Sequence, residues 1–401
     1  MPDWIPATPQ LLRRVSAGAV LDFMRSSGAV TVTDVMEATG LTRATGIAVC
    51  EDLKDRGWIR ELENQRIVGG YRKGRPARRF ELNERAGVVL GMDIGYSKVT
   101  VVVSDLRGNT VGKASRPFDA AGLDAGGRIV HIDDVALAAL SSAGTGQQSV
   151  LAVCAGVAAP VDRHGDVLAA QKFWGLFDID LRRAFQERRG WTVLLENDAN
   201  LAALGDRWMG AAAGVDDVVV ILASERLGSG VIDGGRLVHG SRGSAGELAY
   251  LELVEGVGDT FGIAYLARTW AAEALAGTAP SALRSIAPAQ VEAKDVFAAA
   301  AEGDAVALGI LDRLADRMAR VIGTVGTMWN PELVVIGGGV ARSAGVMLGP
   351  ISDRLSRFTA TPPRVAVSPL GDSVVTVGAV RGALDYVEKH SLDLDLSAAT
   401  G

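Results

Sequence analysis

Short apolar segments that end in polar or glycine-rich turns recur along the chain from about residue 86 onward. Residues 88–94 (VVLGMDI), 150–157 (VLAVCAGV) and 192–196 (TVLLE) are short and rich in β-branched residues, so we expect buried strands there. Residues 218–222 and 333–336 follow the same pattern. Because open α/β sheets bind ligands at the turns beyond their strands, the pattern predicts an α/β fold with a site at those turns.

Length and charge divide the chain. The 401 residues exceed one ordinary core and indicate about two or three domains, and 48% hydrophobic and 22% charged residues are typical of a soluble globular protein. Residues 1–85 contain 14 Lys and Arg against 11 Asp and Glu, and the rest contains 27 against 36. The resulting charges, +3 and −9, favour contact of the N-terminal region with a polyanion.

The sequence indicates neither a membrane protein nor a secreted one. No apolar run approaches the length of a bilayer span, and the first residues lack the basic and apolar segments of a signal peptide. Cys50 and Cys154 are the only cysteines, which favours a reducing compartment. We therefore expect a cytoplasmic protein with no membrane partner.

The N-terminal region has the helix start and stop signals that are typical of a winged helix-turn-helix. Residues 9–27 carry apolar residues at helical spacing, and a second helix is expected from an N-cap at Thr33 to Gly40. Thr42 is expected to cap a third helix that ends at Gly57. Residues 58–62 and 66–68 are then predicted to be the two strands of the wing.

The third helix is the candidate recognition helix. Its core face is predicted to be Val49, Cys50 and Leu53. The residues left near its N-terminus to contact bases are Thr42, Arg43, Thr45, Ile47 and Ala48. A small helical protein-interaction module is the alternative interpretation of the same pattern, and an exposed Ile47 reads either as a thymine-methyl contact or as half-buried core.

A basic stretch follows the predicted wing. Residues 66–79 (RIVGGYRKGRPARR) contain no acidic residue, and Pro76 favours an extended path. The placement favours contact of Arg72, Lys73 and Arg75 with phosphates or the minor groove, against the alternative of a solvated linker. We predict a DNA-binding domain over 1–70, a linker over 71–85 and a second domain over 86–401.

The order of motifs resembles the ROK family (repressors, open reading frames and sugar kinases), specifically its regulators with an N-terminal winged helix. The resemblance covers nearly the whole chain. It rests on GLTRAT, KGRPARRFELN, GMDIGYSK, LLENDANLAALG, GSGVIDGGRLVHGSRGSAGELAY, NPELVVIGGGV and TVGAVRGAL. It implies a two-lobed, actin-like sugar-kinase fold with sugar in the interlobe cleft, lobe one covering about 86–205 and 380–401 and lobe two about 206–379.

Three residues match the family's sugar ligands. The resemblance implies that Asn197 and Asp198 contact sugar hydroxyls, that Asp198 corresponds to the catalytic base, and that Glu247 binds adjacent hydroxyls. A carboxylate can accept the proton of a hydroxyl that attacks a γ-phosphate, so the chemistry is consistent. The alternatives are that Asn197 and Asp198 only cap the following helix, and that Glu247 is an exposed loop acid.

The chain departs from the family pattern at both phosphate-binding turns. Family kinases carry Asp-Ile-Gly-Gly-Thr-Lys at the first turn, whereas this chain keeps Asp93 and Gly95 but has Tyr96 in place of the second glycine. At the second turn, Ser224-Glu225-Arg226 replaces Gly-Thr-Gly. Side chains and a carboxylate where backbone donors should converge predict that ATP is not turned over, that Asp198 is a vestigial base and that no cofactor is bound.

The family's structural zinc site is also absent from the sequence. Tyr250 occupies the position of its histidine, and residues 250–270 contain neither Cys nor His. Since a tetrahedral site needs four such ligands, we expect no metal. We expect Tyr250 to line and narrow the ligand pocket.

These observations predict a transcriptional regulator of the ROK type without kinase activity. Its expected partners are an operator in double-stranded DNA and a sugar or related effector, and paired half-sites imply a homodimer or tetramer. Two alternatives stay open: an active sugar kinase with a regulatory head, favoured by Asp198 and Glu247, and a DNA binder that senses no ligand, favoured if Tyr250 fills the pocket.

Overall fold

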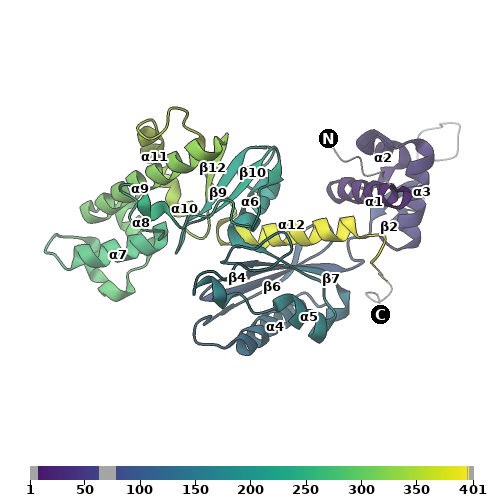
Figure 1. Ribbon diagram of the computed structural model, residues 1–401, viewed down its shortest axis with the longest axis horizontal. Helices are drawn as coiled ribbons and strands as arrows, with labels where there is room; N and C mark the ends of the chain where they lie inside the picture. Colours follow the sequence, from purple (N-terminus) through teal and green to yellow (C-terminus); the bar gives the residue numbers. More distant parts are fainter. Residues whose placement is uncertain (1–7, 63–77, 395, 397–401) are drawn as a thin grey trace, which may run out of the picture.

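A computed structural model describes residues 8–62, 78–394 and 396. The described chain forms a head and a body of two lobes, each built around its own sheet (Figure 1). The predicted α/β fold class, a winged helix-turn-helix followed by a two-lobed actin-like domain, is confirmed. Within the described residues, no helix is both long and apolar enough to cross a bilayer.

The head packs three helices on a small antiparallel sheet. The helices are α1 (Pro9–Ser26), α2 (Val32–Thr39) and α3 (Arg43–Asp55). The sheet has the order β1 (Val30–Thr31), β3 (Arg79–Leu82), β2 (Ile59–Leu62). Leu53, Trp58 and Phe80 are almost fully buried, and they belong to an apolar core that continues from the head into the body.

The helix boundaries in the head follow from their caps. The prediction of Thr33 as the cap of α2 is wrong: Thr31 is the N-cap, and its side chain and that of Asp34 form a reciprocal capping box. Gly40 ends α2 in the left-handed conformation, and Thr42 caps α3 as predicted. The two helices are therefore joined by the tight turn that the sequence predicted.

The wing differs from the prediction. β2 pairs with β3 in the register Ile59↔Leu82 to Leu62↔Arg79, so a wing strand lies at Arg79–Leu82. The strand predicted at residues 66–68 lies outside the described residues. Because β3 belongs to the head's sheet, the head extends into the range 71–85 that was predicted to be linker.

Lobe one has a five-stranded sheet in the order β6-β5-β4-β7-β8. Its strands are β4 (Val88–Ile94), β5 (Lys98–Ser104), β6 (Thr110–Pro117), β7 (Val150–Val157) and β8 (Val193–Asn197). Helices α4 (Ala125–Ser142) and α5 (Leu181–Arg189) pack beside this sheet, and α12 (Val374–Lys389) crosses β4 and β7 (Figure 1). The carboxyl ends of β4 and β8 carry Asp93 and Asn197 to the same edge.

Lobe two has a second five-stranded sheet in the order β11-β10-β9-β12-β13. Its strands are β9 (Val218–Leu222), β10 (Gly228–Asp233), β11 (Arg236–Leu237), β12 (Leu333–Gly337) and β13 (Arg364–Val367). Its helices are α7 (Ile263–Leu275), α8 (Ala293–Ala301), α9 (Ala305–Trp329), α10 (Ala341–Ala344) and α11 (Leu348–Leu355). An aliphatic core joins these helices to the sheet.

Helices α6 (Asp198–Met209) and α12 join the parts of the molecule. They touch backbone to backbone, since a Cβ on Gly378 would lie 1.8 Å from the Leu201 carbonyl oxygen. α6 also contacts β9 and β10 of lobe two, and the far end of α12 contacts α1 of the head (Figure 1). Because α6 ends at Met209 and α12 begins at Val374, both helices extend beyond the lobe boundaries predicted at 205 and 380.

Candidate functional site

A cavity of about 670 Å³ lies between the two lobes. Lobe one contributes the turn after β4 and the start of α6, and lobe two contributes the turn between β9 and β10 and the loop around Glu247. The predicted site residues that line it are Asp93, Gly95, Tyr96, Asn197, Asp198, Ser224, Glu225, Arg226 and Glu247. The structure thus brings both candidate phosphate turns and the candidate sugar ligands into one cleft.

Asn197 and Asp198 occupy the transition from β8 to α6. The Asn197 side-chain oxygen accepts hydrogen bonds from the backbone N–H groups of Ala199 (2.9 Å) and Asn200 (3.1 Å), and its amide donates to the Ala159 carbonyl (3.1 Å). One oxygen of Asp198 accepts from Ala199 N–H at 2.8 Å. Asn197 therefore caps α6, as the structural alternative stated, and lines the cavity as well.

Carboxylates dominate the electrostatics of the cleft around Asn197 and Asp198. Burial raises the pKa of Asp198 to about 7, with Asp93 and then Glu247 adding repulsion. Burial likewise raises the pKa of Asp93 to about 6, against the attraction of Lys98. Desolvation within the cleft raises the pKa of Glu247, although part of that residue's surface is exposed. Near neutral pH, Asp198 can therefore donate as well as accept a hydrogen bond.

The turn after β4 is tight and carries an aromatic side chain, that of Tyr96. The Gly95 N–H donates to the Lys98 carbonyl at 3.0 Å, and a Cβ on Gly95 would lie 3.1 Å from that oxygen. The Tyr96 ring, 49% exposed, lies with its centroid 5.7 Å from that of Phe173. Tyr96 therefore adds an aromatic side chain to the cavity wall where family kinases have glycine.

The turn between β9 and β10 is held by contacts that the sequence did not reveal. Both Glu225 oxygens accept hydrogen bonds from Arg268, at 2.7 and 2.8 Å, so its negative charge is offset by a cation from α7. The Ser224 carbonyl accepts from the Ala264 N–H at 2.9 Å, next to the start of the same helix. The predicted charge of Glu225 is present, but it is engaged in a bidentate ion pair.

Arg226 connects the two lobes across the cleft. Its guanidinium carbon lies 5.4 Å from the centroid of the Phe173 ring in lobe one and 5.8 Å from that of Phe261 in lobe two. Its Nη2 donates to the Thr260 hydroxyl at 2.9 Å. Phe261 in turn stacks on Tyr265 with centroids 4.0 Å apart. These aromatic residues were missed at the sequence level because they are far apart along the chain.

Tyr250 does not belong to the cavity wall. Its side chain is 77% exposed, it precedes a short 3-10 turn, Leu251–Leu253, and it is not among the residues that line the cavity. The prediction that Tyr250 lines and narrows the pocket is therefore wrong. The alternative in which Tyr250 fills the sugar pocket is wrong for the same reason.

The candidate DNA-contacting residues of α3 lie on its surface. The Thr42 hydroxyl accepts from the Thr45 N–H at 3.3 Å, while Arg43 and Ile47 are exposed, Ile47 by 40%. Val49, Cys50 and Leu53 are buried as predicted. Thr42 and Thr45 therefore form the cap of α3 itself, and Arg43 and Ile47 are open to solvent beside it.

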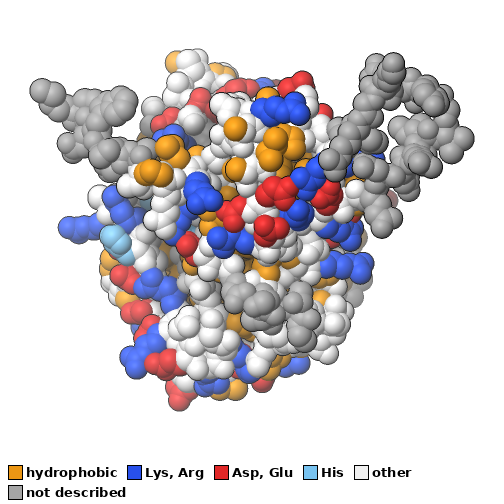
Figure 2. Space-filling model, turned by 90° about the vertical axis from the view of Figure 1, so that its right-hand side faces the viewer, with side chains coloured by type: hydrophobic (Ala, Val, Ile, Leu, Met, Phe, Trp, Pro, Cys, Tyr) orange, Lys and Arg blue, Asp and Glu red, His pale blue; other side chains and the backbone are white. Residues whose placement is uncertain are grey.

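The basic stretch is described only at its end. Arg72, Lys73 and Arg75 lie outside the described residues. Arg78 forms ion pairs with Glu51 and Glu61, so it supports the wing and is not free for phosphate. On the face of the molecule seen from the head, Lys and Arg alternate with Asp and Glu (Figure 2).

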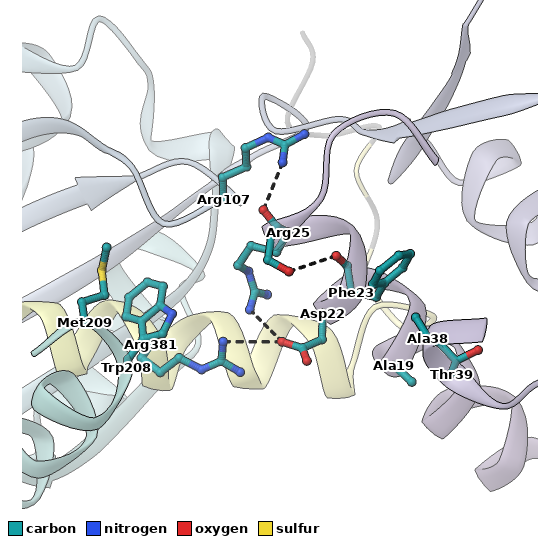
Figure 3. Close-up of a pocket in the computed structure, with 11 residues that line it drawn as sticks. Ala19, Asp22, Phe23, Arg25, Ala38, Thr39, Arg107, Trp208, Met209 and Arg381 are labelled. Carbon is teal, nitrogen blue, oxygen red and sulfur yellow. Dashed lines mark hydrogen bonds and ion pairs between the residues drawn. The ribbon is translucent and has the colours of Figure 1, made fainter. Parts of the chain in front are cut away.

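A second cavity, of about 600 Å³, lies where the head meets the body. Asp22 of α1 pairs with both Arg25 of the same helix and Arg381 of α12 (Figure 3). Arg25 also pairs with Glu388 of α12. Arg107 donates to the carbonyls of Arg25 (3.0 Å) and Ser27 (2.8 Å) at the end of α1. Burial, and then repulsion by Arg381, lowers the pKa of Arg25 to about 10.

The same helix thus touches the head and the cleft. Val374 and Val375, at the start of α12, line the interlobe cavity, whereas Arg381 and Glu388 pair with α1. Trp58 of the head adds a hydrogen bond from its ring N–H to the Ser391 carbonyl, just beyond α12 (2.8 Å). α12, which begins at the cleft, is therefore one of the elements that attach the head to the body, together with Arg107 in the turn between β5 and β6.

The fold and cleft define a two-lobed sugar-kinase-like protein with an added winged head. The sequence model of the ROK family matches residues 89–390, and the chain belongs to this family.

Its relatives include kinases and regulators. It is 27% identical to a glucokinase of Halalkalibacterium halodurans, over 72% of this chain and 92% of that protein. It is 22% identical to a xylose repressor of Caldicellulosiruptor bescii, over 92% of this chain and 95% of that protein. The crystal structure of a ROK family transcriptional regulator homologous to the Escherichia coli MLC protein matches with a TM-score of 0.76 at 20% identity, over 97% of this chain and all of that one.

Proposed function

We propose that this protein is a transcriptional repressor of the ROK type, which binds an operator in double-stranded DNA and releases it when a sugar or related ligand enters the interlobe cleft. The observation that carries the proposal is the path of α12. Its first residues line the cleft, and its later residues hold α1 of the head. A ligand that changes the lobe angle would therefore move the head, which supplies a physical coupling between two sites.

The head supplies the DNA contacts in this proposal. Arg43 and Ile47 are open at the start of α3, where recognition helices meet base edges, and Arg72, Lys73 and Arg75 supply phosphate or minor-groove contacts. Reading two half-sites requires two heads, so the active form is a homodimer or tetramer. The nearly full-length similarity to a xylose repressor supports this arrangement.

The cleft senses a ligand without transferring phosphate. Tyr96 replaces the glycine of the first phosphate turn, and Arg226 lies between Phe173 and Phe261 at the second. Side chains thus occupy positions from which backbone N–H groups bind phosphates in kinases. Asp198 and Glu247 are retained as hydrogen-bonding partners for hydroxyl groups.

The second candidate function is an ATP-dependent sugar kinase with a regulatory head. Two observations favour it: Asp198 is present at the position of the family's base with a pKa raised to about 7, and glucokinases are among the relatives. A general base poised near neutral pH suits proton abstraction from a hydroxyl. ADP release with hexoses separates this candidate from the first.

The test of the repressor proposal is a triple substitution in the basic stretch. Replacing Arg72, Lys73 and Arg75 together by alanine should weaken binding to the DNA upstream of the protein's own gene about tenfold to a thousandfold at physiological salt. The slope of log affinity against log salt should fall by up to about three. The measurement is a fluorescence anisotropy titration at several salt concentrations.

A matched control removes the same charge elsewhere. Arg116, Arg236 and Arg242 are exposed on the body, and their joint replacement by alanine should leave DNA affinity and salt slope unchanged. Equal losses in both triple variants would show a charge effect without a defined surface. Failure of the wild type to bind duplex DNA would disprove the proposed function.

A further inference from the structure

Arg226 differs in its pairing from the other cation on the cavity wall. Among the described residues that line the cleft, Lys98 and Arg226 are the two cations. Lys98 lies 3.8 Å from an Asp372 carboxylate oxygen. Arg226 forms no ion pair within the described part of the chain, and its hydrogen bond goes to the neutral hydroxyl of Thr260. The cleft thus contains a positive charge that no carboxylate of the described chain neutralises by direct contact.

The guanidinium of Arg226 is held in place. Phe173 and Phe261 flank it from the two lobes, and the Thr260 hydroxyl accepts from one nitrogen. The backbone of Arg226 forms a bridge with that of Phe261, which anchors the stem of the side chain. An arginine fixed in this way loses little conformational freedom when a ligand binds, and its remaining N–H donors are available to an acceptor.

The position of Arg226 relative to the carboxylates sets the shape of a matching ligand. Its positive charge acts on Glu247, where it opposes the raised pKa, and Glu247 in turn acts on Asp198. One small molecule can therefore meet the carboxylates with hydroxyl groups and Arg226 with another group. A planar fork of N–H donors is best matched by a phosphate or a carboxylate.

We propose that the effector of this protein is an acidic sugar derivative, whose hydroxyl groups face Asp198 and Glu247 and whose phosphate or carboxylate pairs with Arg226. The inference rests on the proposed role of the cleft as the effector site and adds the chemical class of the ligand. Arg226 is then the residue that separates acidic sugars from neutral ones. Phe173 and Thr260 position its guanidinium.

The experiment compares neutral and acidic probes on the full-length protein. Glucose, mannose and xylose are tested beside glucose 6-phosphate, mannose 6-phosphate and glucuronate, with inorganic phosphate as a separate probe. Dissociation constants are measured by isothermal titration calorimetry. We expect one acidic sugar to bind at least tenfold more tightly than its neutral parent, and the phosphate and carboxylate arms identify which anion is recognised.

Variants then assign the effect to one side chain. Arg226→Gln should reduce the preference for the acidic probe to about unity, and Arg226→Lys should retain only part of it, because lysine lacks the fork. Arg236→Gln, which removes an equal charge from the exposed surface of β11, should keep the preference intact. A preference unchanged in Arg226→Gln, with or without a lower Tm, would show that Arg226 only bridges the lobes and would overturn the proposal. So would the absence of binding by every acidic probe.

DNA release separates this inference from the proposed function. If neutral sugars release DNA equally from wild type and Arg226→Gln, the repressor proposal stands and the acidic effector is disproved. If acidic probes bind through Arg226 but no probe releases DNA, the ligand class stands and the coupling to the head fails.

Discussion

The two ends of the interlobe cleft differ in the side chains that they present. At one end, the cavity is lined by Asn197 and Asp198 at the start of α6 and by Glu247 in the loop beyond β11, the three residues that we propose bind the hydroxyl groups of a ligand. At the other end, Tyr96 and Arg226 introduce side chains that meet Phe173. The difference supports our proposal that this cleft binds hydroxyl groups at one end without binding nucleotide phosphates at the other.

The two altered turns also depend on each other. Phe173 lies next to both the Tyr96 ring and the Arg226 guanidinium, so side chains from the two turns converge on one residue of lobe one. Glu225 is likewise matched, by Arg268 of α7. These contacts support the proposal that the two turns form a packed surface and do not bind the phosphates of a nucleotide.

The largest expected effect of the side chains at the two turns is the loss of phosphoryl transfer. We expect ADP release with ATP, magnesium and any hexose to stay at background, several orders of magnitude below a working sugar kinase, because side chains occupy both phosphate turns. A coupled assay of ADP release checks this. ADP release above background that disappears in Asp198→Asn would show that the turns containing Tyr96 and Arg226 still bind ATP.

Glu247 gives the next largest effect. Glu247→Ala should weaken effector binding about tenfold to a hundredfold, because a charged hydrogen bond to a hydroxyl is lost, and should leave DNA affinity without effector unchanged. DNA release is measured across the sugar panel. Glu252→Ala removes an exposed acid nearby and is the control, which should release DNA like wild type. If Glu247→Ala also releases DNA like wild type, the effector does not bind next to Glu247.

Asp198 gives a smaller effect, seen in the pH dependence of stability. Its pKa is about 7 in the folded protein and near 4 when unfolded, so between these values the unfolded chain loses a proton that the folded chain keeps. The contribution of Asp198 to stability therefore falls as pH rises from about 4 to 7 and stays low above 7.

Asp198→Asn cannot ionise, so its stability relative to wild type should rise over that range. The expected gain is on the order of 1 to 2 kcal/mol after allowance for partial exposure, measured by urea unfolding at pH 4.5 and 8. Asp353→Asn, an exposed aspartate of α11, is the control and should show no such trend. A constant difference between Asp198→Asn and wild type would contradict the burial of this carboxyl.

Local patterns in the sequence were sufficient for the elements and for the placing of most site residues. Apolar strands followed by polar turns predicted β4, β7, β8, β9 and β12, and Gly40 and Thr42 predicted the turn between α2 and α3. These signals are local because a cap or a turn depends on neighbours within a few residues. The cap of α2 was predicted at Thr33, two residues too late, because reciprocal hydrogen bonds with Asp34 make Thr31 the cap.

By itself, then, the sequence determined the fold class, the family and which residues reach the cleft from the ends of strands. Only the tertiary structure decided what those residues contact. It pairs Glu225 with Arg268 and Arg226 with Phe173, turns Tyr250 outward, and joins β2 to a strand at Arg79–Leu82. The three pairings join residues far apart along the chain, whose proximity follows from tertiary packing and from no local preference of the backbone.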